Sequence, residues 1–227
     1  MIPLRDTIRS RRFPVVTVTI IVINVLIFLY QASLPREALE ALVRWYGVIP
    51  ARDLPHLLAH PFSVDAYTPF VTAIFLHGGW FHVLGNMLYL WVFGDNVEDS
   101  MGRGRFILFY LLVGFAGSLA HIFANPDSSM PTIGASGAVA GILGAYFISF
   151  PRSRVLALLP LFIFFTLVEI PAVLFLILWF GMQLLSGVAS LAVTGQTVAW
   201  WAHIGGFLAG VLLIRLFRHS PHRSRFH

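Results

Sequence analysis

The chain of 227 residues contains no cysteine, no lysine and few charged residues of either sign. The lack of cysteine excludes a disulfide-stabilised secreted domain and a thiolate metal site. Charged residues make up 11%, against roughly 25% in an ordinary soluble domain, while hydrophobic residues make up 58%. So few charges could not cover the surface of a soluble enzyme or keep a chain disordered. We therefore expect a membrane protein whose main partner is the lipid bilayer.

The basic residues do not indicate nucleic-acid binding, although the formal charge is +5 and the pI about 10.2. All 15 basic residues are arginine, and 12 of them flank apolar stretches in four groups. Cytoplasmic loops of membrane proteins carry such an excess of positive charge, so the arginines are better interpreted as topology markers than as a phosphate-binding face. The other three, Arg36, Arg44 and Arg52, lie beside acidic residues.

The uncharged stretches predict an all-α membrane protein with a bundle of six transmembrane helices, since one crossing needs about 20 largely apolar residues. We expect the helices over roughly residues 14–32, 72–94, 106–125, 134–150, 171–192 and 198–217. A long, partly helical external loop, about 34–65, should join the first two. Residues 155–168 are apolar but too short to cross alone, and we expect an interfacial segment or an extension of the fifth helix.

Six crossings place both termini on one side, which the arginine distribution makes cytoplasmic. The predicted organisation is a cytoplasmic segment (1–12), a membrane domain (13–217) and a basic cytoplasmic tail (218–227). No internal repeat is visible, so an inverted-repeat transporter gains no support. We expect a multi-pass membrane protein with both termini in the cytoplasm.

Four polar residues on three of these helices fall at one depth. His82 and Asn86 lie one turn apart near the outer end of the second helix, because residues i and i+4 share a face. Ser136 begins the fourth helix and His203 lies near the start of the sixth. All three helices run inward, so the four residues share the outer third of the bilayer.

These residue types can perform acyl transfer. A serine hydroxyl becomes a good nucleophile when a base removes its proton, and histidine is the usual base, so Ser136 and His203 form a candidate dyad. His82, Asn86 and the backbone N–H of Ser136 could donate hydrogen bonds to the oxyanion. A dyad is favoured over a triad with aspartate, because a charged carboxylate in lipid is costly.

Small residues predict which helices touch. Gly137 and Gly141 on the fourth helix, and Gly206 and Gly210 on the sixth, repeat at the spacing that lets helix backbones approach closely in lipid. Gly137, together with Gly134 just before the helix, would also leave room for a substrate backbone.

Each polar residue has a plainer interpretation when it is considered alone. Ser136 could simply pack in a glycine-rich helix, and His203 could be an interhelical hydrogen-bond partner. His77 and His121 are interpreted as structural or interfacial. The combination favours function, because polar groups embedded in the membrane are costly and are commonly functional.

Three segments resemble the signature motifs of the rhomboid family of intramembrane serine proteases, in the expected order. They are HVLGN at 82–86, GASG at 134–137 and AHIGG at 202–206. The resemblance covers about residues 68–216 and corresponds to the compact six-helix form common in bacteria. It implies cleavage of membrane-anchored proteins in or beside a transmembrane segment, without metal, nucleotide or other cofactor.

The same resemblance assigns the roles. It implies Ser136 as nucleophile and His203 as general base and then acid, with His82, Asn86 and the Ser136 amide as the oxyanion hole. It also implies a mobile fifth helix and a cap loop, about 186–198, that admit substrate and water.

Two positions depart from the family pattern. The Trp-Arg pair that many members carry in the first external loop is absent just before the second helix, where Tyr67 and Thr68 stand. Ala140 replaces a tyrosine that in some members stacks on the catalytic histidine. The loop must therefore be anchored differently, and another group, such as Trp200 or an aromatic residue of the fifth helix, must hold His203.

Two other functions compete with the protease. A catalytically inactive rhomboid-like protein would bind transmembrane clients without cutting them. A haem or metal protein using the membrane histidines is disfavoured, because the chain has no HExxH motif, no cysteine and no acidic residue near these histidines. We therefore expect transmembrane protein substrates as partners, and neither metal nor nucleic acid.

Overall fold

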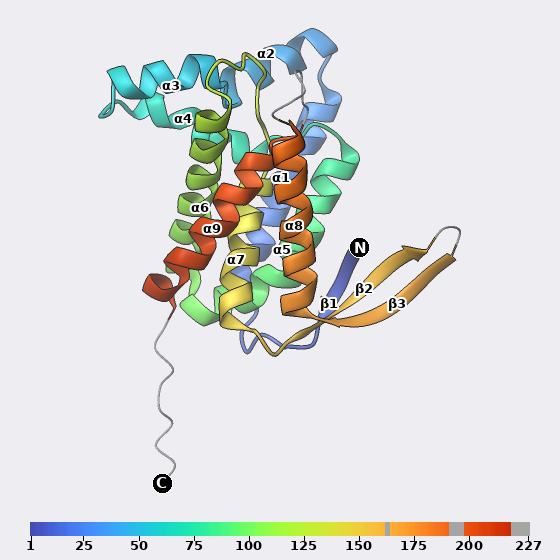
Figure 1. Ribbon diagram of the computed structural model, residues 1–227. Coiled ribbons are helices and arrows are strands. Elements are labelled where there is room, and N and C mark those ends of the chain that lie inside the picture. Colours follow the sequence, from blue (N-terminus) through green and yellow to red (C-terminus); the bar gives the residue numbers. More distant parts are fainter. Residues whose placement is uncertain (162–163, 191–197, 219–227) are drawn as a thin grey trace.

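The computed structural model describes residues 1–161, 164–190 and 198–218. Long helices form a bundle that lies between two structurally different ends (Figure 1). The α2–α4 end carries three short helices, which are α2 (Arg36–Tyr46), α3 (Pro50–Ala59) and α4 (Val64–Thr72). The sheet end carries a three-stranded sheet, made of β1 (Ile2–Asp6), β2 (Arg154–Leu161) and β3 (Phe164–Pro171).

Six longer helices make up the bundle: α1 (Val15–Ser33), α5 (Trp80–Met101), α6 (Arg103–Ala124), α7 (Ser136–Ser149), α8 (Ala172–Ser190) and α9 (Trp200–Phe217). Among the described residues, α1, α6, α8 and α9 are long and apolar enough to cross a membrane. Helix α7 is apolar but has only 14 residues, and α5 carries three acidic residues near its end. A mostly helical membrane fold is confirmed, while the count of six crossings stays a prediction.

Most helix boundaries agree with the expected ranges within about three residues, but the second helix is displaced along the chain. It was expected over 72–94 and runs from Trp80 to Met101. Residues 73–75 form a separate 3-10 turn, η1 (Ala73–Phe75), and Gly78 and Gly79 interrupt the helical path before Trp80. Helix α8 ends at Ser190 in the described part, and the remainder of the expected cap loop up to residue 197 lies outside it, as does the tail from 219 to 227.

The described residues of the apolar segment 155–168 belong to the paired strands β2 and β3, so the expected helical extension is wrong. Strands β2 and β3 are antiparallel, with Leu158 opposite Leu167, and β1 pairs antiparallel with β2. Branched and aromatic residues favour strands, and Pro160 would disrupt a helix. An ion pair of 3.5 Å between Arg154 Nε and Glu169 Oε2 joins β2 to β3.

Helix α7 lies at the centre of the bundle, and its residues from 137 to 146 are all buried. It contacts α9 through glycines: a Cβ added at Gly206 would lie 2.0 Å from the carbonyl oxygen of Gly137, and one at Gly210 would lie 2.0 Å from that of Gly141. Because real Cβ atoms do not approach so closely, the two backbones meet only where side chains are missing.

Two carboxylates, the buried Glu98 and the half-buried Asp6, hold the sheet end together. Glu98, only 3% exposed, accepts hydrogen bonds from the backbone N–H groups of Val16 (3.1 Å) and Thr17 (2.8 Å) and from the Thr17 hydroxyl (2.8 Å). It thereby satisfies the free N–H groups at the start of α1. Asp6 of β1 accepts hydrogen bonds from the Tyr146 hydroxyl (2.5 Å) and from Asn96 Nδ2 (2.9 Å).

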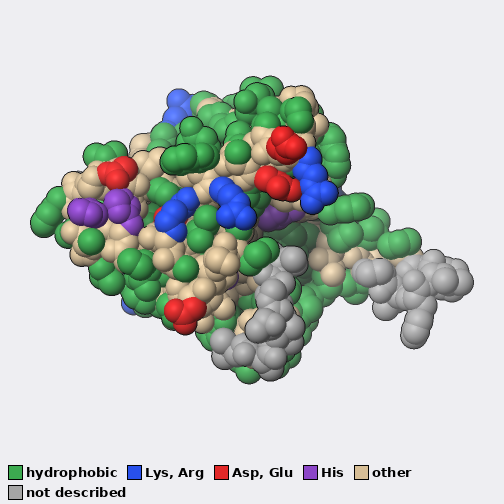
Figure 2. Space-filling model, turned by 90° about the horizontal axis from the view of Figure 1, so that it is seen from above, with side chains coloured by type: hydrophobic (Ala, Val, Ile, Leu, Met, Phe, Trp, Pro, Cys, Tyr) green, Lys and Arg blue, Asp and Glu red, His purple; other side chains and the backbone are tan. Residues whose placement is uncertain are grey.

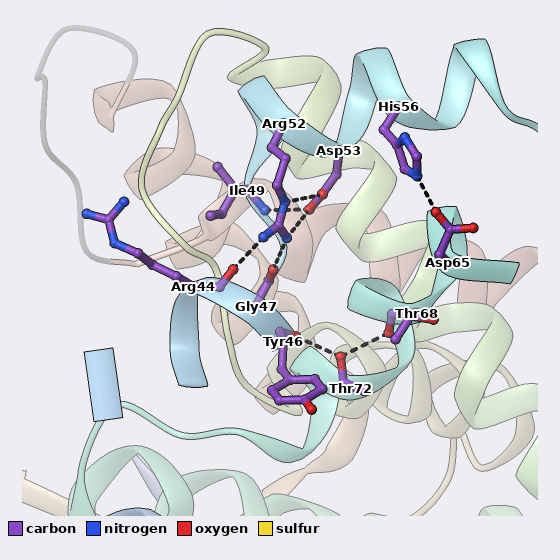
Figure 3. A network of polar contacts seen from close by, with 10 residues as sticks. All are labelled: Arg44, Tyr46, Gly47, Ile49, Arg52, Asp53, His56, Asp65, Thr68 and Thr72. Carbon is purple, nitrogen blue, oxygen red and sulfur yellow. Dashed lines mark hydrogen bonds and ion pairs between the residues drawn. The ribbon is translucent and has the colours of Figure 1, made fainter. Parts of the chain in front are cut away.

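At the opposite end, a polar network anchors the segment 34–65, which is partly helical as expected (Figure 3). The Arg52 guanidinium contacts Asp53 Oδ1 at 2.6 Å and donates to the carbonyls of Arg44 and Gly47, while Asp53 Oδ2 accepts from the N–H of Ile49 at 2.7 Å. This arginine and its neighbouring aspartate anchor the loop without the Trp-Arg pair.

The anchored loop also fixes the segment that leads into α7. The N–H of Val48 donates to the carbonyl of Thr132 at 3.0 Å, and the N–H of Thr132 donates back at 2.7 Å. Two residues further on, the N–H of Gly134 donates to the carbonyl of Ala73 at 2.8 Å. The α2–α4 end therefore sets the backbone position of the turn that precedes Ser136.

Candidate active site

The first turns of α7 and α9 bring Ser136 and His203 to the same end of the bundle. Ser136 is half-buried at the start of α7, and the next residue, Gly137, contacts Ala202, the residue before His203. Gly117 of α6 packs against both, since a Cβ there would lie 2.6 Å from the Ala202 carbonyl oxygen and 3.3 Å from the Gly137 Cα. Within the described residues, no hydrogen bond joins the Ser136 hydroxyl to the His203 ring. Such catalytic contacts are commonly long before substrate binds.

Two side chains of α5 face the turn before Ser136. A Cβ added at Gly134 would lie 2.6 Å from His82 Nε2 and 3.7 Å from Asn86 Nδ2. Gly134 also has a φ of +127°, which residues with a side chain rarely adopt. Backbone conformation and lack of space therefore both require glycine here. The turn at Gly134 places His82 and Asn86 close to Ser136, the first residue of α7.

A backbone contact sets the tautomer of His82. The N–H of Gly78 donates to His82 Nδ1 at 3.3 Å, so the ring proton lies on Nε2, the nitrogen that faces Gly134. The loop that carries Gly78 is held by Gln31 of α1, which is 2% exposed. Its Oε1 accepts from the His77 N–H at 3.0 Å, and its Nε2 donates to the His77 carbonyl at 3.3 Å.

Asn86 offers a second donor. Its Nδ2 is buried and makes no hydrogen bond within the described part of the chain. A buried amide without a partner is unfavourable, which makes it suited to stabilise a negative oxygen that develops beside it.

Gln183 of α8 sets the tautomer of His203 in the opposite sense. His203 Nδ1 lies 2.7 Å from Gln183 Oε1, and Gln183 is 8% exposed. An amide oxygen only accepts, so Nδ1 carries the proton and Nε2 keeps a lone pair. Trp179 and Trp200 flank the ring, with centroids 6.3 and 6.0 Å from it. The expected aromatic neighbours are present, and the hydrogen-bond partner is an amide.

Sequence reasoning missed Gln31 and Gln183. Each is a glutamine in an otherwise apolar helix, where an amide is costly unless it is hydrogen-bonded, and that cost was the available signal. His77, interpreted as structural, is 2% exposed and lies edge-on to His82 with the ring centroids 5.1 Å apart. His121 lies in the last turn of α6.

The site opens toward the α2–α4 end. Figure 2 shows this face, with a hollow near the centre of the bundle in which a histidine side chain is visible. A separate small cavity of about 20 Å³ is lined by Gly134 and Ser136 together with Ser118 of α6. That volume is enough for about one water molecule.

Comparison with known proteins supports one family. The Rhomboid domain model matches residues 65–220. Rhomboid protease GluP of Bacillus subtilis is 47% identical over 75 residues, which cover 33% of this chain and 14% of that protein. Rhomboid-like protein 11, chloroplastic, of Arabidopsis thaliana is 30% identical over 170 residues, covering 71% of this chain and 56% of that protein.

RHOMBOID-like protein 1 of Arabidopsis thaliana is 35% identical over 155 residues, which cover 68% of this chain and 36% of that protein. The matches thus span between 14% and 56% of the length of these three curated relatives. The family model matches more than half of the chain, and four helices are long and apolar enough to cross a membrane. The chain is therefore an integral membrane protein that belongs to the rhomboid family.

Proposed function

We propose that this protein is an intramembrane serine endopeptidase that cleaves peptide bonds in or next to transmembrane segments of other membrane proteins. The observation that carries the proposal is the pair of opposite histidine tautomers. His82 Nδ1 accepts a hydrogen bond from the Gly78 N–H, which leaves an N–H at Nε2, whereas His203 Nδ1–H donates a hydrogen bond to Gln183 Oε1, which leaves a lone pair at Nε2. One histidine is thereby prepared as a donor and the other as a base.

In the proposed mechanism, His203 Nε2 removes the proton from Ser136 as its Oγ attacks the scissile carbonyl carbon. The carbonyl π electrons move to oxygen, and His82 Nε2–H, Asn86 Nδ2 and the Ser136 N–H stabilise the oxyanion. The tetrahedral intermediate collapses, the C–N bond breaks, and His203 gives its proton to the leaving amine. Water then attacks the acyl-enzyme with His203 again as base, which releases the carboxyl product and regenerates Ser136.

The proposed topology has six crossings, with both termini and the sheet end in the cytoplasm of a bacterium and the α2–α4 end outside. The arginine distribution supports it, because Arg5, Arg9, Arg11, Arg12, Arg103, Arg105, Arg152, Arg154, Arg215 and Arg218 flank helix ends at the sheet end. Residues 13–217 would form the membrane protease domain between the cytoplasmic segment 1–12 and the tail 218–227. Substrate would then be cleaved near the outer face.

The test uses purified full-length protein with a panel of single-span membrane substrates, and mass spectrometry locates the cut. We expect Ser136→Ala and His203→Ala each to reduce cleavage by at least about 10⁴-fold without loss of folded protein, because each removes a member of a cooperative pair. Ser33→Ala, which alters an exposed serine at the end of α1, is the matched control and should retain activity. Continued cleavage by Ser136→Ala would disprove the mechanism.

The alternative is a rhomboid-like protein that binds transmembrane clients without cutting them. The two functions differ in the reactivity of Ser136. A fluorophosphonate probe should label the wild type and not Ser136→Ala if the dyad is active. A folded wild type that resists labelling, and still retains clients on affinity capture, would establish the binding function instead.

A further inference from the structure

A polar cavity lies at the sheet end, away from the candidate dyad. It has a volume of about 550 Å³ and lies where the segment after β1, the turn between α5 and α6, the end of α7 and the end of α9 converge (Figure 1). Four arginines line it: Arg9, Arg11, Arg12 and Arg218. Three come from the N-terminal segment and one from the other end of the chain, so only the folded bundle brings them together.

These four guanidinium groups carry an excess of positive charge. In the described part of the chain, none of them makes an ion pair or a side-chain hydrogen bond. The single acidic residue of the lining, Asp99, accepts a hydrogen bond from the backbone N–H of Arg11 at 3.1 Å. Even if Asp99 neutralises one arginine, three positive charges remain around one cavity.

The other described carboxylates at this end already have partners. Glu98 is bound by the start of α1, and Asp95 accepts hydrogen bonds from the N–H and Nδ2 of Asn96. Asp6 is bound by Tyr146 and Asn96, and Glu169 is paired with Arg154. The tail from 219 to 227 contains no aspartate or glutamate. The remaining positive charge would attract an anion from outside the chain.

A second cavity of about 270 Å³ extends the first toward the start of α1. It shares Arg12, Asp99 and Gly102 with the first cavity. It adds Arg103, Phe13, Pro14 and Glu98, whose carboxylate is bound by the start of α1. Phe13 is exposed and immediately precedes the apolar helix α1. The basic cavities thus open at the level where the chain enters the membrane, which is the level of lipid headgroups.

We propose that this pair of cavities binds a phosphate ester, and that the ester is the headgroup of an anionic phospholipid. Arginine forms two parallel hydrogen bonds with phosphate oxygens, and basic pockets on the cytoplasmic side of membrane proteins are suited to anionic headgroups. The positive-inside rule explains the sign of the charge at this end, but it does not explain why arginines from both ends of the chain line one cavity. The bound phosphate would tie the N-terminal segment to the end of α9.

The test measures lipid binding and does not depend on proteolysis. Native mass spectrometry of the full chain compares phosphatidylglycerol with phosphatidylcholine of the same acyl chains. The variant Arg9→Gln/Arg218→Gln removes two arginines of the cavity. The control, Arg5→Gln/Arg152→Gln, removes the same net charge from exposed arginines at the same end but outside the cavity.

We expect the wild type to prefer phosphatidylglycerol, and the cavity variant to lose about tenfold in its affinity while the control loses less than about twofold. Equal losses in the two variants, or a wild type without preference, would overturn the site. Thermal unfolding of both variants checks that the fold is kept, and if the cavity variant unfolds, Arg9→Gln and Arg218→Gln are measured singly against the same criterion.

Excess inorganic phosphate distinguishes the source of the ester. For a headgroup site, it should displace little lipid, because the acyl chains add contacts along α1. If inorganic phosphate binds alone with the same dependence on Arg9 and Arg218, the ligand is soluble phosphate and the lipid assignment is wrong.

Discussion

Around the candidate dyad the bundle holds its polar side chains as neutral pairs, whereas at the sheet end it uses carboxylates, of which Glu98 is buried. His203 meets the Gln183 amide and His82 meets the Gly78 N–H. At the other end, Glu98 meets the start of a helix and Asp6 meets Tyr146. Glu98 is solvated by the free N–H groups at the start of α1, and Asp53 of the external loop likewise accepts the N–H of Ile49 at the start of α3. Next to the dyad, amides and imidazoles avoid placing a full charge within the membrane.

Removing the carboxylate at the sheet end should have the largest effect on stability. Glu98→Ala leaves two helix N–H groups and a hydroxyl without their partner, so we expect a loss of about 3–5 kcal/mol in the free energy of unfolding. Unfolding in mixed micelles with increasing denaturing detergent measures it. Glu169→Gln, which breaks an exposed ion pair at the same end, is the matched control and should cost less than about 1 kcal/mol. Similar losses in the two variants would show that the buried contacts of Glu98 stabilise the fold no more than an exposed ion pair does.

Changing the neutral pair at the other end should separate activity from stability. Gln183→Leu keeps the approximate size but removes the acceptor, and we expect the rate of fluorophosphonate labelling of Ser136 to fall about 10–100-fold, because His203 loses the group that fixes its tautomer.

Gln183→Glu keeps an acceptor and adds a carboxylate in the membrane. It should therefore label faster than Gln183→Leu but unfold more easily than the wild type. If both variants label like the wild type, Gln183 does not position the base. If Gln183→Glu is as stable as the wild type, the cost of charge does not explain the neutral pairing.

The smallest expected effect is the change in folding stability with pH that is due to Asp6. Burial raises the pKa of the Asp6 carboxyl, although the hydrogen bond from Tyr146 opposes the shift. The folded state therefore favours the protonated acid, so this contribution to stability is present below about pH 4 and is lost as the pH rises through the raised pKa. Asp6→Asn removes the titration, and its thermal midpoint should fall less than that of the wild type between pH 4 and pH 7. Parallel pH curves for the two proteins would contradict this account.

Much of the bundle could be predicted from where charges are missing. The ranges of α1, α6, α7 and α9 followed from uncharged stretches, because a spanning helix requires them. The end of α5 was missed because its acidic residues indicated the end of a span, and only the contact of Glu98 with α1 explains how the helix continues. Strands β2 and β3 were missed because an apolar run of 14 residues has no period that distinguishes a strand from a helix.

The residues of the candidate site were accessible from the sequence to different degrees. Ser136, His203, His82 and Asn86 were found because helix direction places them at one depth. The roles of Gln31 and Gln183 depend on contacts with residues 46 and 20 positions away in the sequence, which no local pattern encodes. Sequence therefore indicated the groups that would react, while the groups that would orient them required the tertiary structure.

The pairing of β1 with β2 has a consequence for the order of synthesis. Ile2 lies opposite Leu158 and Asp6 lies opposite Val155, so the first strand made must wait for the ribosome to add about 150 residues. At roughly 5–20 residues per second, that wait lasts about 8–30 s. During this time β1 has no strand to pair with, while α1, α5, α6 and α7 are made. The sheet can therefore close only after those helices exist, and all three of its strands are complete before the chain adds α8, the helix that brings Gln183 to His203.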